Sequence, residues 1–285
     1  MPKQSDMAGR VCVVTGATRG IGRATAQGLA QLGASVVLVA RRPEDGLTVS
    51  HQIAGATGVT PDVVAADLAS QASIRHAADE IRSRYPRLHV LINNAGVIPQ
   101  RRETTVDGLE MQLAVNYLAY FLLTGLLLPQ LVAGAPSRIV NVSSGAHSHA
   151  SLDFDDLQAE RGYQANSVYG RSKLADILFT YELSRRLQGT GVTVNCLNPG
   201  VVATGMLADY MGIPRTGDAS ASTFGAKPEE GAETSIYLAS SPEVETETGK
   251  YFERKRPVVS SRESYDEAVA RRLWEVSERL TGRST

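Results

Sequence analysis

The sequence predicts a single α/β domain in which helices cover both faces of one parallel, doubly wound sheet of about seven strands. Along residues 8–253, short apolar and β-branched runs alternate with longer segments of helical period. A glycine-rich turn separates the first run from the first helical segment. Polar or small residues follow several runs directly, at the strand ends where open α/β sheets bind ligands. Residues 254–285 predict a helical tail, so we expect one catalytic domain over 1–285.

The composition excludes several classes of protein. Hydrophobic residues make up 42% and charged residues 21%, as in ordinary globular domains. A net charge of −1 offers no attraction for nucleic acid or an anionic membrane. Cys12 and Cys196 lie in apolar runs and predict buried free thiols, which favours a reducing, cytoplasmic location. The most apolar run, 121–128, is too short to span a bilayer and no signal-peptide pattern occurs, so we expect a soluble protein.

The first strand is predicted over residues 10–15, and a helical pattern runs to residue 32. Between them lies the turn Gly16-Ala17-Thr18-Arg19-Gly20-Ile21-Gly22. Glycines allow the backbone to turn tightly and approach a pyrophosphate, and the helix N-terminus offers free N–H groups and a positive dipole end. Strand, turn and helix in this order predict a dinucleotide site rather than a plain βα turn.

The second strand, predicted over residues 35–40, indicates which dinucleotide binds. An acidic residue at the end of this strand would hold the ribose 2′-hydroxyl of NAD. Instead, Arg41 and Arg42 follow the strand, and Arg19 lies in the glycine-rich turn. Because guanidinium groups pair well with phosphate, the sequence predicts NADP(H), with Arg19 and Arg41 as the expected ligands of the 2′-phosphate.

Three strand ends in the middle of the chain carry candidate site residues. Helical patterns over 43–56 and 70–85 flank a third strand, 62–66, which ends at Asp67 and Leu68. A fourth strand, 88–92, runs into Asn93-Asn94-Ala95-Gly96, and a fifth, 138–142, delivers Ser143-Ser144-Gly145. Small, amide and hydroxyl side chains at these ends suit a cofactor crevice.

Two segments between these strands were less clear from the residues alone. A long apolar helix is predicted over 104–131, and it carries Asn116, whose amide is costly to bury without a partner. The spacing alone favours a structural role for Asn116. The long connection 145–166 is rich in Asp, His, Ser and Gln, and such loops are often functional. His147 and His149 lie within it, but no ligand set has recognisable spacing, so no metal site is predicted.

A helix predicted over 166–187, capped by Asn166 or Ser167, carries Tyr169 and Lys173. Four residues apart, these two side chains project from the same helix face. A neighbouring ammonium favours the phenolate and lowers the pKa of a phenol toward a range useful in acid–base catalysis. Alone, Tyr-x-x-x-Lys is a weak signal, because a solvated helix face gives the same spacing.

The rest of the chain completes the alternation. A sixth strand, 191–197, ends at Asn198-Pro199-Gly200, and Thr204 follows shortly after. Residues 203–227 have no clear period and predict a mobile lid over a pocket. A helix is predicted over 228–239, a last strand over 250–252, and a C-terminal helix over 263–280 with Trp274 on its apolar side.

In this order the motifs resemble those of the short-chain dehydrogenase/reductase superfamily, over about residues 9–253. The elements that carry the resemblance are Thr15-Gly16-x-x-x-Gly20-x-Gly22, Asn93-Asn94-Ala95-Gly96, Ser144, Tyr169-x-x-x-Lys173 and Pro199-Gly200. Within the superfamily the chain is most similar to the retinol dehydrogenase and WW-domain oxidoreductase group. The features that point there are Val39-Ala40-Arg41-Arg42, Val140-Asn141-Val142-Ser143-Ser144, the long gap from Ser144 to Tyr169, Ser172-Lys173-Leu174-Ala175 and Arg271-Arg272-Leu273-Trp274-Glu275.

The resemblance implies a Rossmann-type fold and the interconversion of a carbonyl compound and an alcohol by hydride transfer. It implies that Tyr169 is the general acid or base and that Ser144 hydrogen-bonds the substrate oxygen. Lys173 would tune Tyr169 and hold the nicotinamide ribose. Asn116 occupies the family's fourth catalytic position, where it would anchor a water that reprotonates the site through Lys173.

The resemblance also implies the cofactor contacts. Asp67 and Leu68 would border the adenine, Asn94 and Gly96 the adenosine ribose, and residues 199–201 with Thr204 the nicotinamide. The full implied set is Gly16, Thr18, Arg19, Gly20, Ile21, Gly22, Arg41, Arg42, Asp67, Leu68, Asn94, Ala95, Gly96, Tyr169, Lys173, Pro199, Gly200, Val201 and Thr204.

The resemblance implies a lipophilic small-molecule substrate, whose mouth the residues near 150–165 should shape. Many retinol dehydrogenases carry a membrane segment, and none is expected here. Relatives of this kind are often dimers or tetramers, here through helices 104–131 and 166–187, although a monomer fits the sequence equally well.

Two other functions fit parts of the sequence. An extended-type epimerase or dehydratase would use NAD without net redox change, but its glycine motif is spaced differently and it has a larger C-terminal domain. A non-catalytic NADP-sensing or scaffolding protein could share the fold, because fold alone does not fix function. The intact Ser144, Tyr169 and Lys173 count against a pure sensor, which needs none of them.

Overall fold

The computed structural model describes residues 6–213 and 224–283, which are built around one eight-stranded sheet. The strand order is β3-β2-β1-β4-β5-β6-β7-β8; neighbours from β3 to β7 are parallel, and only β8 runs antiparallel to β7. The strands are β1 (Val11–Thr15), β2 (Ser35–Ala40), β3 (Asp62–Ala65), β4 (Val90–Asn93), β5 (Ser137–Val142), β6 (Val192–Asn198), β7 (Lys250–Glu253) and β8 (Arg256–Val258). The predicted doubly wound parallel sheet is confirmed, and β8 is the strand that the prediction lacked.

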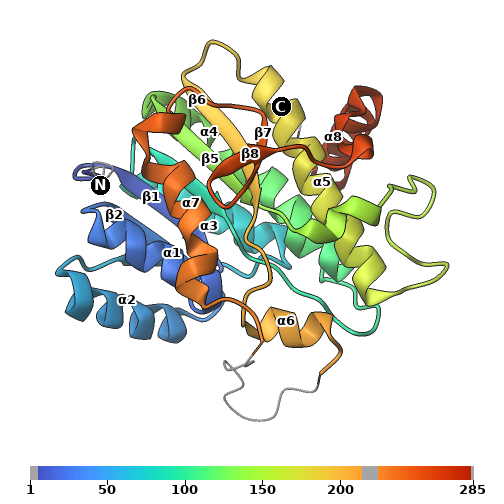
Figure 1. Ribbon diagram of the computed structural model, residues 1–285, viewed down its shortest axis with the longest axis horizontal. Helices are drawn as coiled ribbons and strands as arrows, with labels where there is room; N and C mark the ends of the chain where they lie inside the picture. Colours follow the sequence, from blue (N-terminus) through green and yellow to red (C-terminus); the bar gives the residue numbers. More distant parts are fainter. Residues whose placement is uncertain (1–5, 214–223, 284–285) are drawn as a thin grey trace.

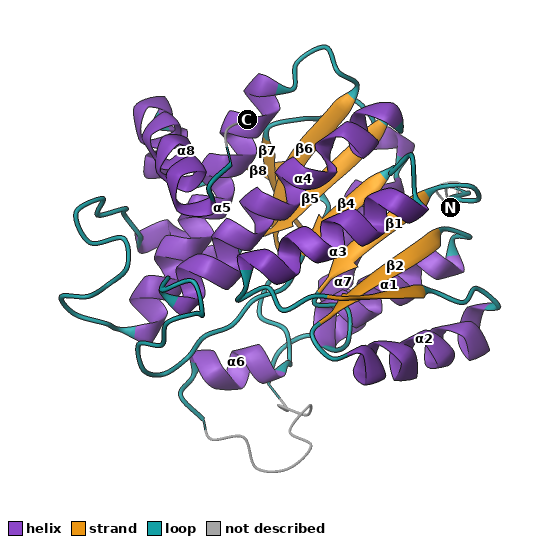
Figure 2. Cartoon of the chain, turned by 180° about the vertical axis from the view of Figure 1, so that it is seen from behind, coloured by secondary structure: helices purple, strands orange, loops and turns teal. Residues whose placement is uncertain are grey.

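Helices cover both faces of the sheet. They are α1 (Gly20–Gln31), α2 (Pro43–Thr57), α3 (Gln71–Arg84), the π-helical η1 (Leu113–Leu118), α4 (Ala119–Ala133), α5 (Ala165–Arg186), α6 (Gly205–Tyr210), α7 (Pro228–Ser240) and α8 (Glu267–Thr281). Short 3₁₀ turns are η2 (Gly145–His149), η3 (Pro242–Val244) and η4 (Arg262–Tyr265). Helices α1 and α7 lie in front of the sheet in Figure 1, and α3 and α4 lie in front of it in Figure 2.

The strands read as continuous apolar runs because both faces of the sheet are buried. In β1, Cys12 and Val14 belong to the core shared with α1, α2 and α7, whereas Val13 belongs to the core shared with α3, α4 and α5. Cys12 and Cys196 are buried free thiols, as their apolar surroundings predicted.

Several predicted boundaries are wrong, each for a local reason. The helix expected from residue 104 begins only after Glu110, whose carboxylate accepts the N–H groups of Gln112 and Leu113 at 2.8 and 2.6 Å. Residues 104–110 instead form a loop closed by a bridge between Thr104 and Glu110. Helix α5 begins at Ala165 without a side-chain cap, so the predicted caps are also wrong.

The C-terminal segments differ from prediction too. Helix α8 begins at residue 267 because Asp266 accepts the N–H groups of Ala268 and Val269. In the predicted lid, 203–227, the structure has α6, while residues 214–223 of that lid lie outside the described part of the chain.

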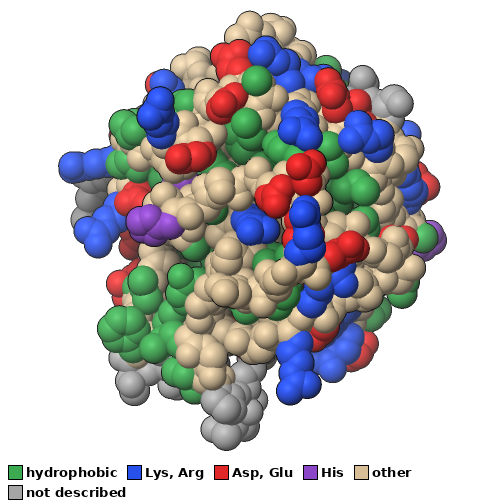
Figure 3. Space-filling model, turned by 90° about the vertical axis from the view of Figure 1, so that its right-hand side faces the viewer, with side chains coloured by type: hydrophobic (Ala, Val, Ile, Leu, Met, Phe, Trp, Pro, Cys, Tyr) green, Lys and Arg blue, Asp and Glu red, His purple; other side chains and the backbone are tan. Residues whose placement is uncertain are grey.

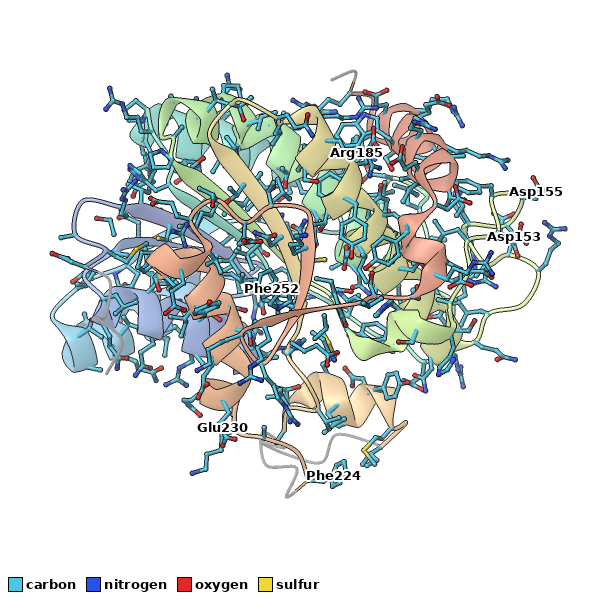
Figure 4. The ribbon with its side chains drawn as sticks, turned by 45° about the horizontal axis from the view of Figure 1, so that its top comes forward. Asp153, Asp155, Arg185, Phe224, Glu230 and Phe252 are labelled. Atoms are coloured by element: carbon cyan, nitrogen blue, oxygen red, sulfur yellow. The ribbon has the colours of Figure 1, made fainter. Side chains whose placement is uncertain are left out.

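Helix α8 covers the outer surface of α4 and α5. The ring of Trp274 lies 4.9 Å from that of Phe121 and 5.9 Å from that of Phe179, measured between centroids. The hydroxyls of Tyr117 and Ser277 are 2.7 Å apart. Arg185 lies on α5 where α8 passes it (Figure 4). The expected pairing of helices 104–131 and 166–187 between subunits stays a prediction.

The segment Leu113–Ala133 is long and apolar enough, by length and composition, to cross a membrane. The sequence-based expectation, which considered only the run 121–128, missed this. In the structure 72% of the most apolar window of this segment is buried inside the protein. A buried core helix meets the same criteria of length and composition. In the structure this segment packs as such a helix, against α3, α5 and α8.

Candidate active site

The glycine-rich turn forms a narrow cradle between β1 and α1. Gly16 and Gly20 have φ angles of +63° and +52°, a region that side chains with a Cβ rarely adopt. A Cβ on Gly22 would lie less than 3.0 Å from the carbonyl oxygen of Gly16 and from Nδ2 of Asn94. Because α1 begins at Gly20, the cradle also faces free helix N–H groups, which suits a pyrophosphate.

Thr15 and Asn94 hold this cradle against the end of β4. The hydroxyl of Thr15 accepts the N–H groups of Asn94 at 2.9 Å and Ala95 at 3.1 Å. In return, Nδ2 of Asn94 donates to the carbonyl oxygen of Thr15 at 2.9 Å. The side chain of Asn94 is thus engaged with the backbone of the glycine-rich turn. Thr15 belongs to the glycine-rich motif, but the sequence alone indicated no site role for it.

The predicted 2′-phosphate ligands differ in what they contact. Arg41 follows β2 directly and is exposed, as is Arg19 at the start of α1. Arg42 is held by Asp45, with Nε donating to Oδ2 at 2.7 Å, and lies 3.9 Å from Glu44. Asp67 is exposed just after β3. Of the two arginines after β2, Arg41 is therefore the better placed to meet a phosphate.

The four predicted catalytic residues come together at the carboxyl ends of β4 and β5. Ser144, two residues after β5, lies close enough to Tyr169 on α5 for its hydroxyl to lower the pKa of the phenol. The ammonium of Lys173 lies 5.8 Å from the centre of the Tyr169 ring. Asn116 donates to the hydroxyl of Ser172 at 3.0 Å, and Ser172 donates to the carbonyl oxygen of Tyr169 at 2.8 Å.

Asn116 lies in η1, where the helix widens to a π-helical turn. Its Oδ1 accepts the N–H of Val97 at 2.8 Å and its Nδ2 donates to the carbonyl oxygen of Val97 at 3.1 Å. The amide therefore joins the loop after β4 to α5, in addition to lying beside the catalytic groups. This satisfies the buried amide that the sequence left unexplained.

Burial raises the pKa of Tyr169, against the lowering effects of Lys173 and of the Ser144 hydroxyl. The sign of the lysine effect is as the sequence predicted, but burial outweighs it in the protein alone. A phenol held protonated at neutral pH is a proton donor.

The ammonium of Lys173 is itself buried and donates two hydrogen bonds within the protein. It donates to the carbonyl oxygen of Val142 and to Oδ2 of Asp176, each at 2.9 Å. Burial alone would lower the pKa of Lys173, but Asp176, followed by Tyr120 and Tyr169, raises it well above its usual range. Asp176 was missed from the sequence, although its spacing of three residues from Lys173 places it on the same helix face.

The predicted nicotinamide segment lies beside both the cradle and the phenol. A Cβ on Gly20 would lie 3.1 Å from Cγ2 of Thr204, the residue that precedes α6. The hydroxyl of Tyr169 lies 3.8 Å from the sulfur of Met206 in α6. Nε2 of Gln100 donates to the carbonyl oxygen of Asp209 at 2.5 Å, which ties α6 to the loop after β4. Met206 was not foreseen.

The insertion between Ser144 and Tyr169 forms a wall beside the site. The phenol of Tyr163 donates to the carbonyl oxygen of Pro99 at 2.7 Å and accepts from Nε2 of Gln112 at 2.8 Å. The loop that carries Asp153 and Asp155 projects away from the body (Figure 4). Exposed apolar side chains lie beside α6: Tyr210, Met211, Ile213 and Phe224. Figure 3 shows hydrophobic side chains gathered at the lower left of the molecule.

Both ring nitrogens of His147 hydrogen-bond the backbone, at Ser144 and at Ser261. Its Nδ1 lies 2.7 Å from the carbonyl oxygen of Ser144, and its Nε2 accepts the N–H of Ser261 at 3.1 Å. The imidazole is therefore neutral with its proton on Nδ1, and burial lowers its pKa. In residues 6–213 and 224–283, no three His, Cys, Asp or Glu side chains are grouped to hold a metal ion.

Comparison with known proteins identifies the relatives of this chain. A model of the short chain dehydrogenases matches residues 10–211. Retinol dehydrogenase 14 of Mus musculus is 45% identical, with 97% of this chain and 87% of that protein covered. Retinol dehydrogenase 13 of Homo sapiens is 45% identical, with 99% of this chain and 87% of that protein covered.

The chain is also similar to solved structures in fold and sequence. An uncharacterised protein from Mycobacterium paratuberculosis has a TM-score of 0.81 and 32% identity, covering 98% of this chain and 96% of that one. Pseudomonas aeruginosa RhlG, solved with NADP in its active site, has a TM-score of 0.71 and 31% identity, covering 88% of this chain and 96% of that one.

Proposed function

The chain belongs to the short-chain dehydrogenase family, and we propose that it interconverts a lipophilic carbonyl compound and its alcohol with NADP(H). The observation that carries the proposal is the convergence of Asn116, Ser144, Tyr169 and Lys173 beside the glycine cradle. A proton donor, an oxygen-binding hydroxyl and a cation at the edge of a dinucleotide cradle are the parts that carbonyl reduction needs.

The residues present fit a phosphorylated dinucleotide. At Gly16 and Gly22 a Cβ would press on Ala95, Asn94 or the backbone of Gly16, so the turn is as tight as an approach to a pyrophosphate requires. Arg41 is exposed at the end of β2, and no acidic residue stands there to bind a 2′-hydroxyl. When bound, the nicotinamide supplies or accepts the hydride. The NADP complex of the Pseudomonas aeruginosa relative supports this preference.

The protein's own residues handle the proton. In reduction, the phenol of Tyr169 donates its proton to the carbonyl oxygen, and the hydroxyl of Ser144 donates a hydrogen bond to the same oxygen. The Lys173 ammonium stabilises the phenolate left behind. In oxidation the phenolate accepts the proton of the alcohol. Such positioned proton transfer typically contributes about 10²–10⁴-fold to the rate.

A lipophilic substrate suits the exposed apolar side chains beside α6. Met211, Ile213 and Phe224 expose apolar side chains near α6, which lies against Tyr169 through Met206. Relatives of this chain are named retinol dehydrogenases. We therefore expect the substrate to be an apolar alcohol or the matching aldehyde or ketone.

The experiment is a turnover panel with purified protein. Oxidation of NADPH is followed by its absorbance with retinaldehyde, medium-chain aldehydes and aromatic ketones, with NADH in parallel. We expect turnover with NADPH, and a loss of NADPH affinity of about tenfold in Arg41→Ala with little change for NADH. Arg23→Ala, another exposed arginine in α1, is the matched control. Equal affinity for NADPH and NADH would refute the cofactor preference, and binding without turnover on any substrate would favour a sensor.

A further inference from the structure

The buried pair of Lys173 and Asp176 is the feature of the site that the proposed reaction leaves unexplained. Their side chains are 3% and 0% exposed, and Nζ and Oδ2 are 2.9 Å apart. A buried ion pair is a poor stabiliser, because removing both charges from water costs about as much as their attraction returns. A carboxylate in this place therefore needs a reason other than fold stability.

The order of the three groups along α5 suggests that reason. Tyr169 stands four residues before Lys173, and Asp176 three residues after it. All three project from one helix face, so the ammonium lies between the phenol and the carboxylate. Asp176 thus contacts the ammonium from the helix turn after Lys173, whereas Tyr169 lies one turn before Lys173, and the carbonyl oxygen of Val142 accepts from the ammonium at 2.9 Å.

The carboxylate of Asp176 has few interactions besides that with Lys173. Its Oδ1 is buried and has no hydrogen-bond partner among the described residues. The titratable groups that interact with it come from four elements: Tyr117 in η1, Tyr120 in α4, Tyr169 and Lys173 in α5, and Cys196 in β6. Among these groups Lys173 is the one cation, so the charge of Asp176 acts mainly on Lys173.

We propose that Asp176 is a positioning residue, which holds the Lys173 ammonium in the site and offsets part of the charge that this ammonium presents to Tyr169. This rests on the proposed function, in which Lys173 serves Tyr169. The proposal predicts the direction in which Asp176 shifts the pKa of Tyr169. With the carboxylate present, the phenol keeps its proton to higher pH, so alcohol oxidation, in which the phenolate accepts a proton, moves to higher pH. The effects on the pKa of Tyr169 have the signs that the proposal requires. Burial raises this pKa most, Lys173 lowers it, and Asp176 raises it.

The test removes the negative charge at residue 176 while keeping the shape of its side chain. Asp176→Asn removes the negative charge, and Asp176→Glu retains it. The matched control is Glu182→Gln, which changes another carboxylate of α5, 8% exposed and paired with Arg185 and Arg186. Titration of Tyr169 is followed by NMR of protein labelled at tyrosine Cζ, with the resonance assigned by its loss in Tyr169→Phe. This readout needs no substrate, so it is independent of turnover.

We expect the Tyr169 resonance of Asp176→Asn to begin titrating about one pH unit lower than in the wild type. In Asp176→Glu and Glu182→Gln it should titrate as in the wild type. With an active substrate, the pH midpoint of kcat/KM for alcohol oxidation should fall by the same amount in Asp176→Asn alone. An unchanged resonance in a folded Asp176→Asn protein, or an equal shift in Glu182→Gln, would overturn the proposal. A shifted resonance without any turnover would leave it standing and refute the proposed function instead.

Discussion

Removing the ring of Trp274 should cost the protein a large part of its stability. The side chain is 5% exposed, and its ring meets Phe121 and Phe179 at centroid distances of 4.9 and 5.9 Å. The guanidinium of Arg186 lies 4.0 Å above it. Each aromatic pair contributes about 0.5–1.5 kcal/mol beyond burial, and truncation of a buried Trp to Ala costs about 3–5 kcal/mol. We expect Trp274→Ala to lower the free energy of unfolding by about that amount, out of a typical ~5–15 kcal/mol.

Trp274 is the one tryptophan of the chain, so its own fluorescence cannot report on the variant. Unfolding is instead followed in guanidinium chloride by far-ultraviolet circular dichroism. Trp274→Phe, which keeps a ring against Phe121 and Phe179, is the control and should lose less than half as much. A loss below ~1 kcal/mol in Trp274→Ala, typical of surface substitutions, would refute the conclusion that α8 is docked as part of the core.

Two further predictions concern the cradle and the support of Ser144. Gly22→Ala would force a Cβ against the carbonyl of Gly16, so calorimetry should show at least about tenfold weaker NADPH binding, while Gly55→Ala, with open space around it, should bind normally. Burial holds the pKa of His147 below its ordinary ~6.5, so its neutral form stabilises the fold above that pH and this contribution is lost as pH falls through the lower folded-state value. His147→Gln should therefore lose less thermal stability than the wild type between about pH 7 and pH 5; an equal loss would contradict this assignment.

The candidate catalytic pair and the cradle could be proposed from the sequence because their pattern is local. A glycine-rich turn between a strand and a helix, and Tyr169 four residues before Lys173, need no knowledge of distant contacts. Ser144 and Asn116 were harder, since a lone serine or asparagine carries little signal. The resemblance to a family supplied them, and the structure places both beside Tyr169.

What the sequence could not predict leaves no recognisable pattern in the local sequence. Strand β8 has three exposed residues, so it shows neither an apolar run nor an alternation. The late start of the helix after Glu110 follows from a side chain turned back onto its own backbone. The contacts of α8 with α4 and α5 join Trp274 to Phe121, about 150 residues earlier, and to Phe179, about 95 residues earlier, which no local period reports. Asp176 was visible as an acidic residue, but its burial against Lys173 was not.

The measurement that tests the central claim most directly is the turnover of Tyr169→Phe. NADPH oxidation is compared for wild type, Tyr169→Phe and the control Tyr237→Phe, whose phenol lies on α7 and contacts Glu243. The account predicts that Tyr169→Phe lowers kcat/KM by about 10²–10⁴-fold while its NADPH affinity stays within a few-fold of wild type. Tyr237→Phe should behave as the wild type. Unchanged turnover in Tyr169→Phe would contradict the assignment of this phenol as the proton donor.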